Sequence, residues 1–120
     1  MKKTRKQFEK HIMSVVSKYQ KKVFLQNHTF RAKHDKDTEY MSCSHAYPYL
    51  NVTIRYSDTA LEDWRNGRDM SPFILHEVCH PLTDPLYNKA LDRFASRNEI
   101  EAERERLTDH ICNIVLTLTT

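Results

Sequence analysis

The sequence has few of the residues that interrupt regular structure, since it contains one glycine and four prolines in 120 residues. Glycine and proline usually mark turns, so their scarcity predicts mostly regular structure joined by short, polar connections. No repeat or low-complexity segment divides the sequence. A chain of this length buries roughly two thirds of its unfolded surface, and we therefore expect a single domain over residues 1–120.

Cysteines and long apolar runs are also scarce. The three cysteines, Cys43, Cys79 and Cys112, show no C-x-x-C spacing. This pattern argues against a disulfide framework and favours free thiols in a reducing compartment. There is no signal-peptide pattern and no apolar run of membrane-spanning length, so we expect a cytoplasmic, intracellular protein without a membrane partner.

The net charge of +3 is small, and many of the basic residues lie in the first 22 positions. Basic residues in a helical pattern usually form a solvated helix face. No aromatic platform or nucleic-acid-binding motif accompanies them, so the sequence favours this interpretation over nucleic-acid binding.

The chain does contain a His-Glu-x-x-His signature, His76-Glu77-Val78-Cys79-His80. On a helix the two histidines lie one turn apart, where both imidazoles can bind one metal ion, and Glu77 is placed to act as a general base on water. Cys79 points away from His76, and we interpret it as a small core residue rather than a ligand. The alternative is a short core helix with two incidental histidines.

The periodicity of the sequence predicts an α+β fold, a small three-stranded antiparallel sheet packed against several helices. We expect a first helix that begins with a Thr4–Gln7 capping box, three strands in a meander, and a short helix that ends at Gly67. Pro81 should end the signature helix beside His80, because the residue before proline avoids the helical region. The expected segments are strands over residues 29–34, 39–46 and 50–56, a helix from Ser71, a helix from Thr83 or Asp84 through Phe94, and a last helix from the Ser96–Glu99 capping box to about Leu118.

A catalytic zinc ion usually has three protein ligands, so the two histidines need a partner. The main apolar stripe of the last helix contains Ile100, Leu107, Ile111, Ile114 and Leu118, and a second face contains Glu101, Glu105, Thr108, Cys112 and Leu116. We predict Glu105 as the third ligand, because Asp109 lies one turn further along and can orient a ligating histidine. The alternatives are Glu101 as the ligand, or a solvated, arginine-paired face.

The signature, followed by Glu105-Arg106-Leu107-Thr108-Asp109, resembles the gluzincin branch of zinc metallopeptidases. The stretch from Leu75 to Leu118 is also similar to small HExxH proteins encoded by bacteriophages. The resemblance implies a minimal zincin-like domain in which His76, His80 and Glu105 bind Zn²⁺, Glu77 is the catalytic base and Asp109 orients a ligand. It also implies that the strand over residues 50–56 borders the cleft and pairs with an extended peptide.

The function expected from these residues is hydrolysis of a peptide or protein substrate by zinc-activated water. Donors that could stabilise the oxyanion are available by residue type, namely Tyr47, Tyr49, Tyr87, His45 and His110. The main alternative is a catalytically inactive zinc-binding protein that engages a partner, such as a host protein, in a phage-infected cell. The sequence fixes no oligomeric state.

Overall fold

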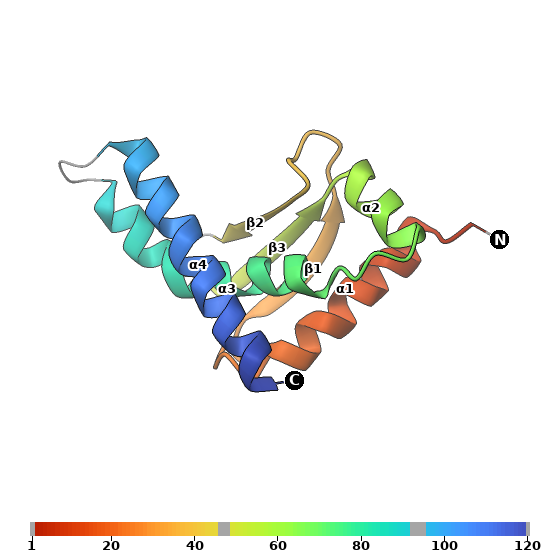
Figure 1. Cartoon of the computed structure of the whole chain (residues 1–120), viewed down its shortest axis with the longest axis horizontal. Helices are drawn as coiled ribbons and strands as arrows, with labels where there is room; N and C mark the ends of the chain where they lie inside the picture. Colours follow the sequence, from red (N-terminus) through yellow and green to blue (C-terminus); the bar gives the residue numbers. More distant parts are fainter. Residues whose placement is uncertain (1, 46–48, 92–95, 120) are drawn as a thin grey trace.

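Four helices and a three-stranded sheet form the described part of the chain, which is an α+β protein as expected (Figure 1). A computed structural model describes residues 2–45, 49–91 and 96–119. The elements are α1 (Arg5–Gln20), β1 (Thr29–His34), β2 (Met41–His45), β3 (Asn51–Tyr56), α2 (Asp58–Arg65), α3 (Ser71–Ala90) and α4 (Arg97–Thr119). Two expected positions, strand residue Ala46 and helix residue Phe94, lie outside the described residues.

The sheet is mixed, so the expected antiparallel meander is wrong. The strand order is β1-β3-β2, with β3 parallel to β1 and antiparallel to β2. Strand β3 is the most apolar of the three, and Val52, Ile54 and Tyr56 are almost completely buried. A meander would leave this strand at an edge. In the observed order the more polar β1 and β2 take both edges.

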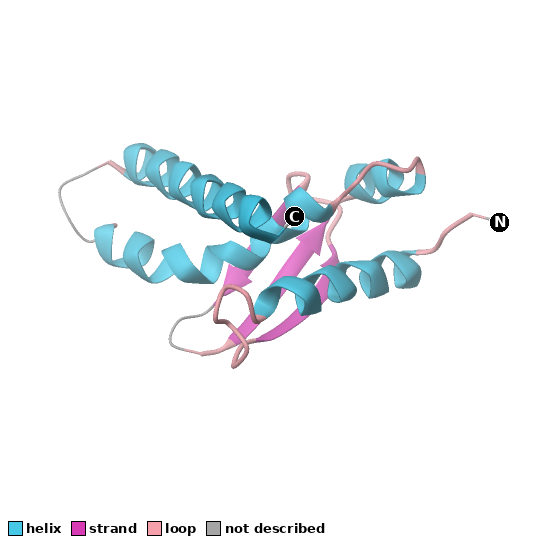
Figure 2. Ribbon diagram, turned by 60° about the horizontal axis from the view of Figure 1, so that its bottom comes forward, coloured by secondary structure: helices cyan, strands magenta, loops and turns pink. Residues whose placement is uncertain are grey.

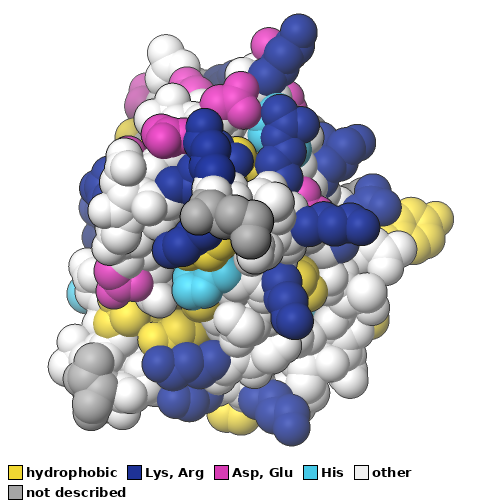
Figure 3. Space-filling model, turned by 90° about the vertical axis from the view of Figure 1, so that its right-hand side faces the viewer, with side chains coloured by type: hydrophobic (Ala, Val, Ile, Leu, Met, Phe, Trp, Pro, Cys, Tyr) yellow, Lys and Arg dark blue, Asp and Glu magenta, His cyan; other side chains and the backbone are white. Residues whose placement is uncertain are grey.

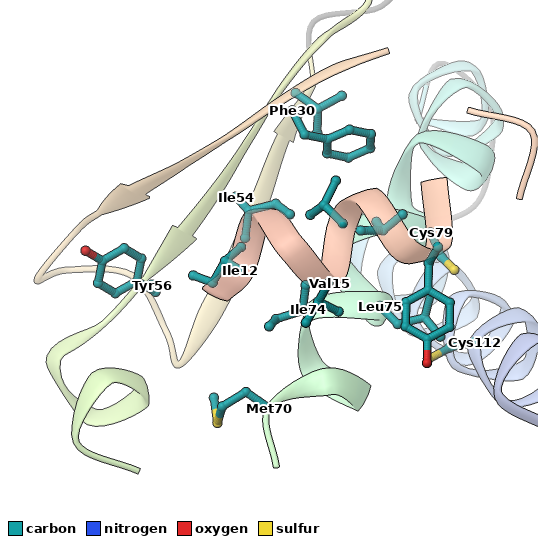
Figure 4. Packing of buried hydrophobic residues seen from close by; sticks show 14 of the residues in the cluster. Ile12, Val15, Phe30, Ile54, Tyr56, Met70, Ile74, Leu75, Cys79 and Cys112 are labelled. Carbon is teal, nitrogen blue, oxygen red and sulfur yellow. The ribbon is translucent and has the colours of Figure 1, made fainter. Parts of the chain in front are cut away.

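One face of the sheet forms the core with α1 and α3 (Figure 4). Alternate strand residues such as Phe30 and Ile54 point toward Ile12 of α1 and Ile74 of α3. The opposite face is polar, and there Arg31 Nε donates to Thr53 Oγ1 over 3.1 Å. The fold therefore has two layers, with the signature helix α3 in the core layer. Leu50, which we expected on the core side, precedes β3 and is 45% exposed.

The ends of α1 and α2 follow the local sequence signals. Thr4 and Gln7 form the predicted capping box of α1. Ser57 caps α2, and Gly67 follows it with a φ of 91°, a conformation that favours glycine. Because the start of α1 and both ends of α2 have the appropriate capping chemistry, these boundaries could be predicted locally.

Helix α3 differs most from its prediction. It begins at Ser71, as expected, and the Asp69 carboxylate accepts from the Ser71 N–H over 3.0 Å. It then continues through Pro81 and Pro85 to Ala90 instead of ending beside His80. Each proline removes one backbone hydrogen bond. The buried position of this segment against α4 outweighs the local preference for a break.

Helices α3 and α4 lie side by side over much of their lengths (Figure 2). The Ser96 hydroxyl accepts from the Glu99 N–H over 3.2 Å at the start of α4. Part of the apolar stripe predicted for α4 does not face the core, because Ile114 is 46% exposed and Leu118 is 78% exposed. Thr108 and Cys112 of the second face are buried instead. Glu105 belongs to that second face and is therefore carried toward α3.

The surface near the amino terminus mixes charges of both signs (Figure 3). Arg5 lies 3.7 Å from Asp58, and Arg65 lies 3.2 Å from Glu62. Lysine and arginine side chains there are interspersed with carboxylates rather than forming a uniform positive surface. No helix among the described residues is long and apolar enough to cross a membrane.

Candidate metal centre

The two signature histidines lie on consecutive turns of α3 and face each other. Their Nε2 atoms are 3.1 Å apart, and the ring centroids are separated by 4.8 Å. The His80 side chain is 7% exposed and the His76 side chain is 23% exposed. The spacing of four residues therefore produces the expected pair of imidazoles at the edge of the core.

Glu105 of α4 is the carboxylate that meets this pair. Its Oε2 atom lies 3.0 Å from His76 Nε2 and 3.6 Å from His80 Nε2. Glu101, the alternative ligand, instead accepts a 3.0 Å hydrogen bond from the Tyr87 hydroxyl. Between the described residues of α3 and α4, the structure thus brings together the three predicted ligands and directs Glu101 elsewhere.

A buried contact between threonines sets the alignment of the two helices. The hydroxyls of Thr83 and Thr108 are 3.1 Å apart. Thr83 lies three residues after His80, and Thr108 lies three residues after Glu105. Each hydroxyl also lies near a carbonyl oxygen of its own helix, Thr83 Oγ1 at 3.2 Å from His80 and Thr108 Oγ1 at 2.8 Å from Arg104. The contact between the hydroxyls adds to these bonds and favours the alignment in which Glu105 is level with the histidines.

Each histidine also has a carboxylate near its other ring nitrogen. Asp109 Oδ1 lies 2.6 Å from His76 Nδ1, at the position predicted for an orienting group. Asp84 Oδ1 lies 3.4 Å from His80 Nδ1, and the sequence reasoning did not single out this residue. Its spacing of four residues from His80 was an available signal, but the expected helix end at Pro81 obscured it.

The three side chains have the geometry and chemistry to hold a metal ion. When Nδ1 of each histidine donates toward its carboxylate, both Nε2 atoms present lone pairs toward Glu105 Oε2. Ligand atoms about 2.0–2.1 Å from a tetrahedral zinc ion lie about 3.3 Å from one another. The three observed separations of 3.0, 3.1 and 3.6 Å match that spacing.

Glu77 is buried beside the histidines, with 3% of its surface exposed. Its Oε1 atom lies 3.6 Å from His80 Nε2. Burial raises the pKa of Glu77, the two histidines oppose this rise, and the carboxylates of Glu105 and Asp84 add to it. A carboxylate with a raised pKa is a better proton acceptor for catalysis near neutral pH.

The pKa of His80 is also raised. Burial lowers it, but the neighbouring carboxylates of Asp84, Glu77 and Glu105 raise it by more. The negative groups around the ring therefore favour a positive charge at this position. A cation bound at the two Nε2 atoms would be stabilised by the same carboxylates.

Two cavities meet at His76 and Glu77, which line both of them. We call the first, of about 440 Å³, the polar cavity; it is also lined by Ser42, His80, Glu105 and Arg104, among others. We call the second, of about 470 Å³, the apolar cavity, because Tyr40, Met41, Phe73 and Leu116 contribute to its wall. A ligand extended across the centre can therefore contact two different surroundings.

The residues expected to stabilise an oxyanion are not gathered at the centre. Tyr47 lies outside the described residues. Tyr49 is 70% exposed, and its carbonyl oxygen lies 2.6 Å from His45 Nε2. Tyr87 lines a different pocket between α3 and α4, and His110 lines a shallow one near the end of α4. None of these four described residues lines the polar or the apolar cavity.

The strand expected to pair with a peptide also differs. Strand β3 is central and paired on both sides, so it has no free edge. Strand β2 is the edge strand nearer the centre, and its residues Met41, Ser42 and Cys43 line the polar cavity. The bordering strand is thus β2, because β3 is inserted between β1 and β2.

Comparison of the chain with protein-family models, with curated proteins and with solved structures found no match. What the site can do therefore has to follow from its own geometry and chemistry.

Proposed function

We propose that the protein is a zinc-dependent hydrolase of peptide bonds, with a minimal zincin-like domain of the gluzincin type. The observation that carries the proposal is the convergence of His76, His80 and Glu105 beside the buried carboxylate of Glu77. Two imidazoles and a carboxylate suit zinc, and a buried base next to them is what hydrolysis requires. A purely structural metal site would not need Glu77 in this position.

In this proposal zinc, when bound by the three ligands, supplies Lewis-acid chemistry for water and for the scissile carbonyl. Glu77 takes the proton from the attacking water and later delivers it to the departing amine. The carboxylates of Asp109 and Asp84 hold the two histidines in orientation. Burial raises the pKa of Glu77, and its carboxylate is therefore a stronger proton acceptor than an exposed one.

The substrate that fits these surroundings is an extended peptide. The free edge of β2 offers backbone groups for pairing along the polar cavity. The apolar cavity, with Tyr40 and Phe73 in its wall, can receive a large apolar side chain next to the scissile bond. We therefore expect cleavage beside residues such as leucine or phenylalanine.

The test combines metal content with proteolysis. Protein purified without added metal should contain one zinc ion per chain, and Glu105→Ala should lose it whereas Glu101→Ala should keep it. Glu77→Gln should retain zinc and lose cleavage of a peptide library analysed by mass spectrometry, because only the base is removed. Full zinc content with no cleavage of any library peptide by the native protein would instead indicate an inactive zinc-binding protein. Stoichiometric iron would contradict the choice of metal.

A further inference from the structure

Arg104 is an arginine in the wall of the polar cavity, directly before Glu105 on α4. Its side chain is only 24% exposed. The guanidinium carbon lies 3.9 Å from the centroid of the Tyr87 ring, in a stacked cation–π contact. The guanidinium is thus held on one face by an aromatic ring and has a restricted position.

The donors of Arg104 are poorly satisfied. Its Nε atom is buried and has no hydrogen-bond partner among the described residues. The nearest carboxylate oxygens are Glu105 Oε1, 3.6 Å from Nη2, and Asp84 Oδ1, 3.9 Å from Nη1. Both distances exceed those of a hydrogen bond, which are about 2.7–3.2 Å for nitrogen and oxygen.

Other arginines near the site do not share this condition. Arg68, at the apolar cavity, has its Nη1 atom 3.0 Å from Asp63 Oδ2. Arg106, two residues along the same helix, has its Nε atom 2.9 Å from Glu103 Oε2. A guanidinium that is largely buried, held in place and short of acceptors is prepared for an oxygen acceptor that enters the cavity.

We propose that Arg104 is the catalytic residue that binds the oxyanion formed on the scissile carbonyl. This inference rests on the proposed peptidase function and supplies the donor that the sequence reasoning could not identify. Among the described residues that line the polar cavity, Arg104 is the one permanently charged donor. It approaches the centre from the α4 side, next to the carboxylate of Glu105.

The reaction balances without any further reactant. Water adds to the carbonyl carbon, Glu77 takes one proton, and the carbonyl π electrons move to the oxygen, which acquires the negative charge that Arg104 binds. The carbonyl then re-forms, the carbon–nitrogen bond breaks, and Glu77 returns the proton to the amine. Arg104 remains protonated throughout, because its pKa is too high for it to act as an acid.

The experiment compares native protein with Arg104→Gln and Arg104→Lys, and uses Arg106→Gln as the matched control on the same helix. The probe is N-phosphoryl-Leu-Phe amide, whose tetrahedral anion mimics the oxyanion and which has no free carboxylate. Affinity for the probe is measured by calorimetry on zinc-loaded protein. Zinc affinity is measured separately by competition with a chromophoric chelator.

We expect Arg104→Gln to keep its zinc affinity and to bind the probe about 10²–10³-fold more weakly, which is the usual effect of losing one oxyanion donor. The probe affinity of Arg104→Lys should lie between those of the native protein and Arg104→Gln, because lysine keeps the charge but loses the planar guanidinium. Arg106→Gln should bind zinc and probe as the native protein does.

Four results would overturn the inference. Equal probe affinity in native and Arg104→Gln protein would remove Arg104 from the chemistry and leave the proposed function intact. The same probe with a free terminal carboxylate in place of the amide serves as the comparison. If Arg104→Gln lowers the affinity only for this free-acid form, Arg104 binds a terminal carboxylate instead. If both variants lose zinc and probe in parallel, Arg104 only positions Glu105. A native, zinc-loaded protein that binds neither form of the probe would refute the proposed function itself, and this inference with it.

Discussion

Replacing Asp109 with asparagine tests whether the carboxylates beside the histidines tune the metal site. Asp109 Oδ1 lies 2.6 Å from His76 Nδ1. Asparagine keeps an oxygen that can accept this hydrogen bond but removes the negative charge, so the change isolates the electrostatic effect. Loss of such an orienting group typically lowers metal affinity about 10- to 100-fold, or about 1.4–2.8 kcal/mol.

The exposure of Asp109 decides where in that range the effect should fall. Its side chain is 65% exposed, so water and salt screen its charge, and we expect a loss of about tenfold. The Asp84 side chain is only 12% exposed, and Asp84→Asn should therefore cost more, close to 100-fold, although its contact with His80 is longer. The order of the two effects follows from burial, not from distance.

The assay is zinc competition against a chromophoric chelator at low and at high salt, with Glu101→Gln as a control on the same helix but outside the ligand set. The Asp109→Asn effect should shrink at high salt, and the Asp84→Asn effect should persist. Unchanged zinc affinity in both variants, under conditions where Glu105→Ala loses zinc, would refute the role given to these carboxylates.

Two further predictions concern stability, measured by urea unfolding. Tyr56→Phe removes a buried hydroxyl that donates to Glu9 over 2.5 Å, and should lower the free energy of unfolding by about 1.5–3 kcal/mol. Burial is the largest cause that raises the pKa of Tyr56, and the hydrogen bond and charge of Glu9 add to it. The unfolded chain therefore loses the Tyr56 proton first, and the free energy of unfolding of the native protein falls as the pH rises above about 10. An equally steep fall in the Tyr56→Phe variant would contradict this. Pro85→Ala should raise the free energy of unfolding by about 1–3 kcal/mol, because alanine restores the backbone N–H that α3 lacks at this position. A lower free energy of unfolding would show that the packing of the proline ring stabilises the protein.

The features that sequence predicted best are those governed by local rules. The capping box of α1 and the position of Gly67 after α2 depend on a few neighbouring residues, and both match the structure. The facing of His76 and His80 follows from helical periodicity alone. These relationships do not depend on how distant segments pack, so a sequence is sufficient to predict them.

Features that depend on pairing between distant segments were predicted less well. Alternation in residues 50–56 indicates a strand but not its neighbours, so the parallel pairing with β1 could not be read from it. On α4 the most apolar stripe ends in Ile114 and Leu118, which are exposed, whereas Thr108 is completely buried. Hydrophobicity alone ranks these residues in the wrong order, because the Thr108 hydroxyl donates to the Arg104 carbonyl oxygen and also meets the Thr83 hydroxyl across the helix interface.

The continuation of α3 past Pro81 connects the fold to the proposed chemistry. A helix that ended at His80 would not place Asp84 one turn beyond it, and His80 Nδ1 would lose its carboxylate. Thr83 would also leave the position from which it meets Thr108, and nothing equivalent would hold Glu105 level with the histidines. The free energy that a proline costs inside a helix is therefore offset by contacts that only the continued helix makes. This explains why a reliable local rule fails at the candidate metal centre.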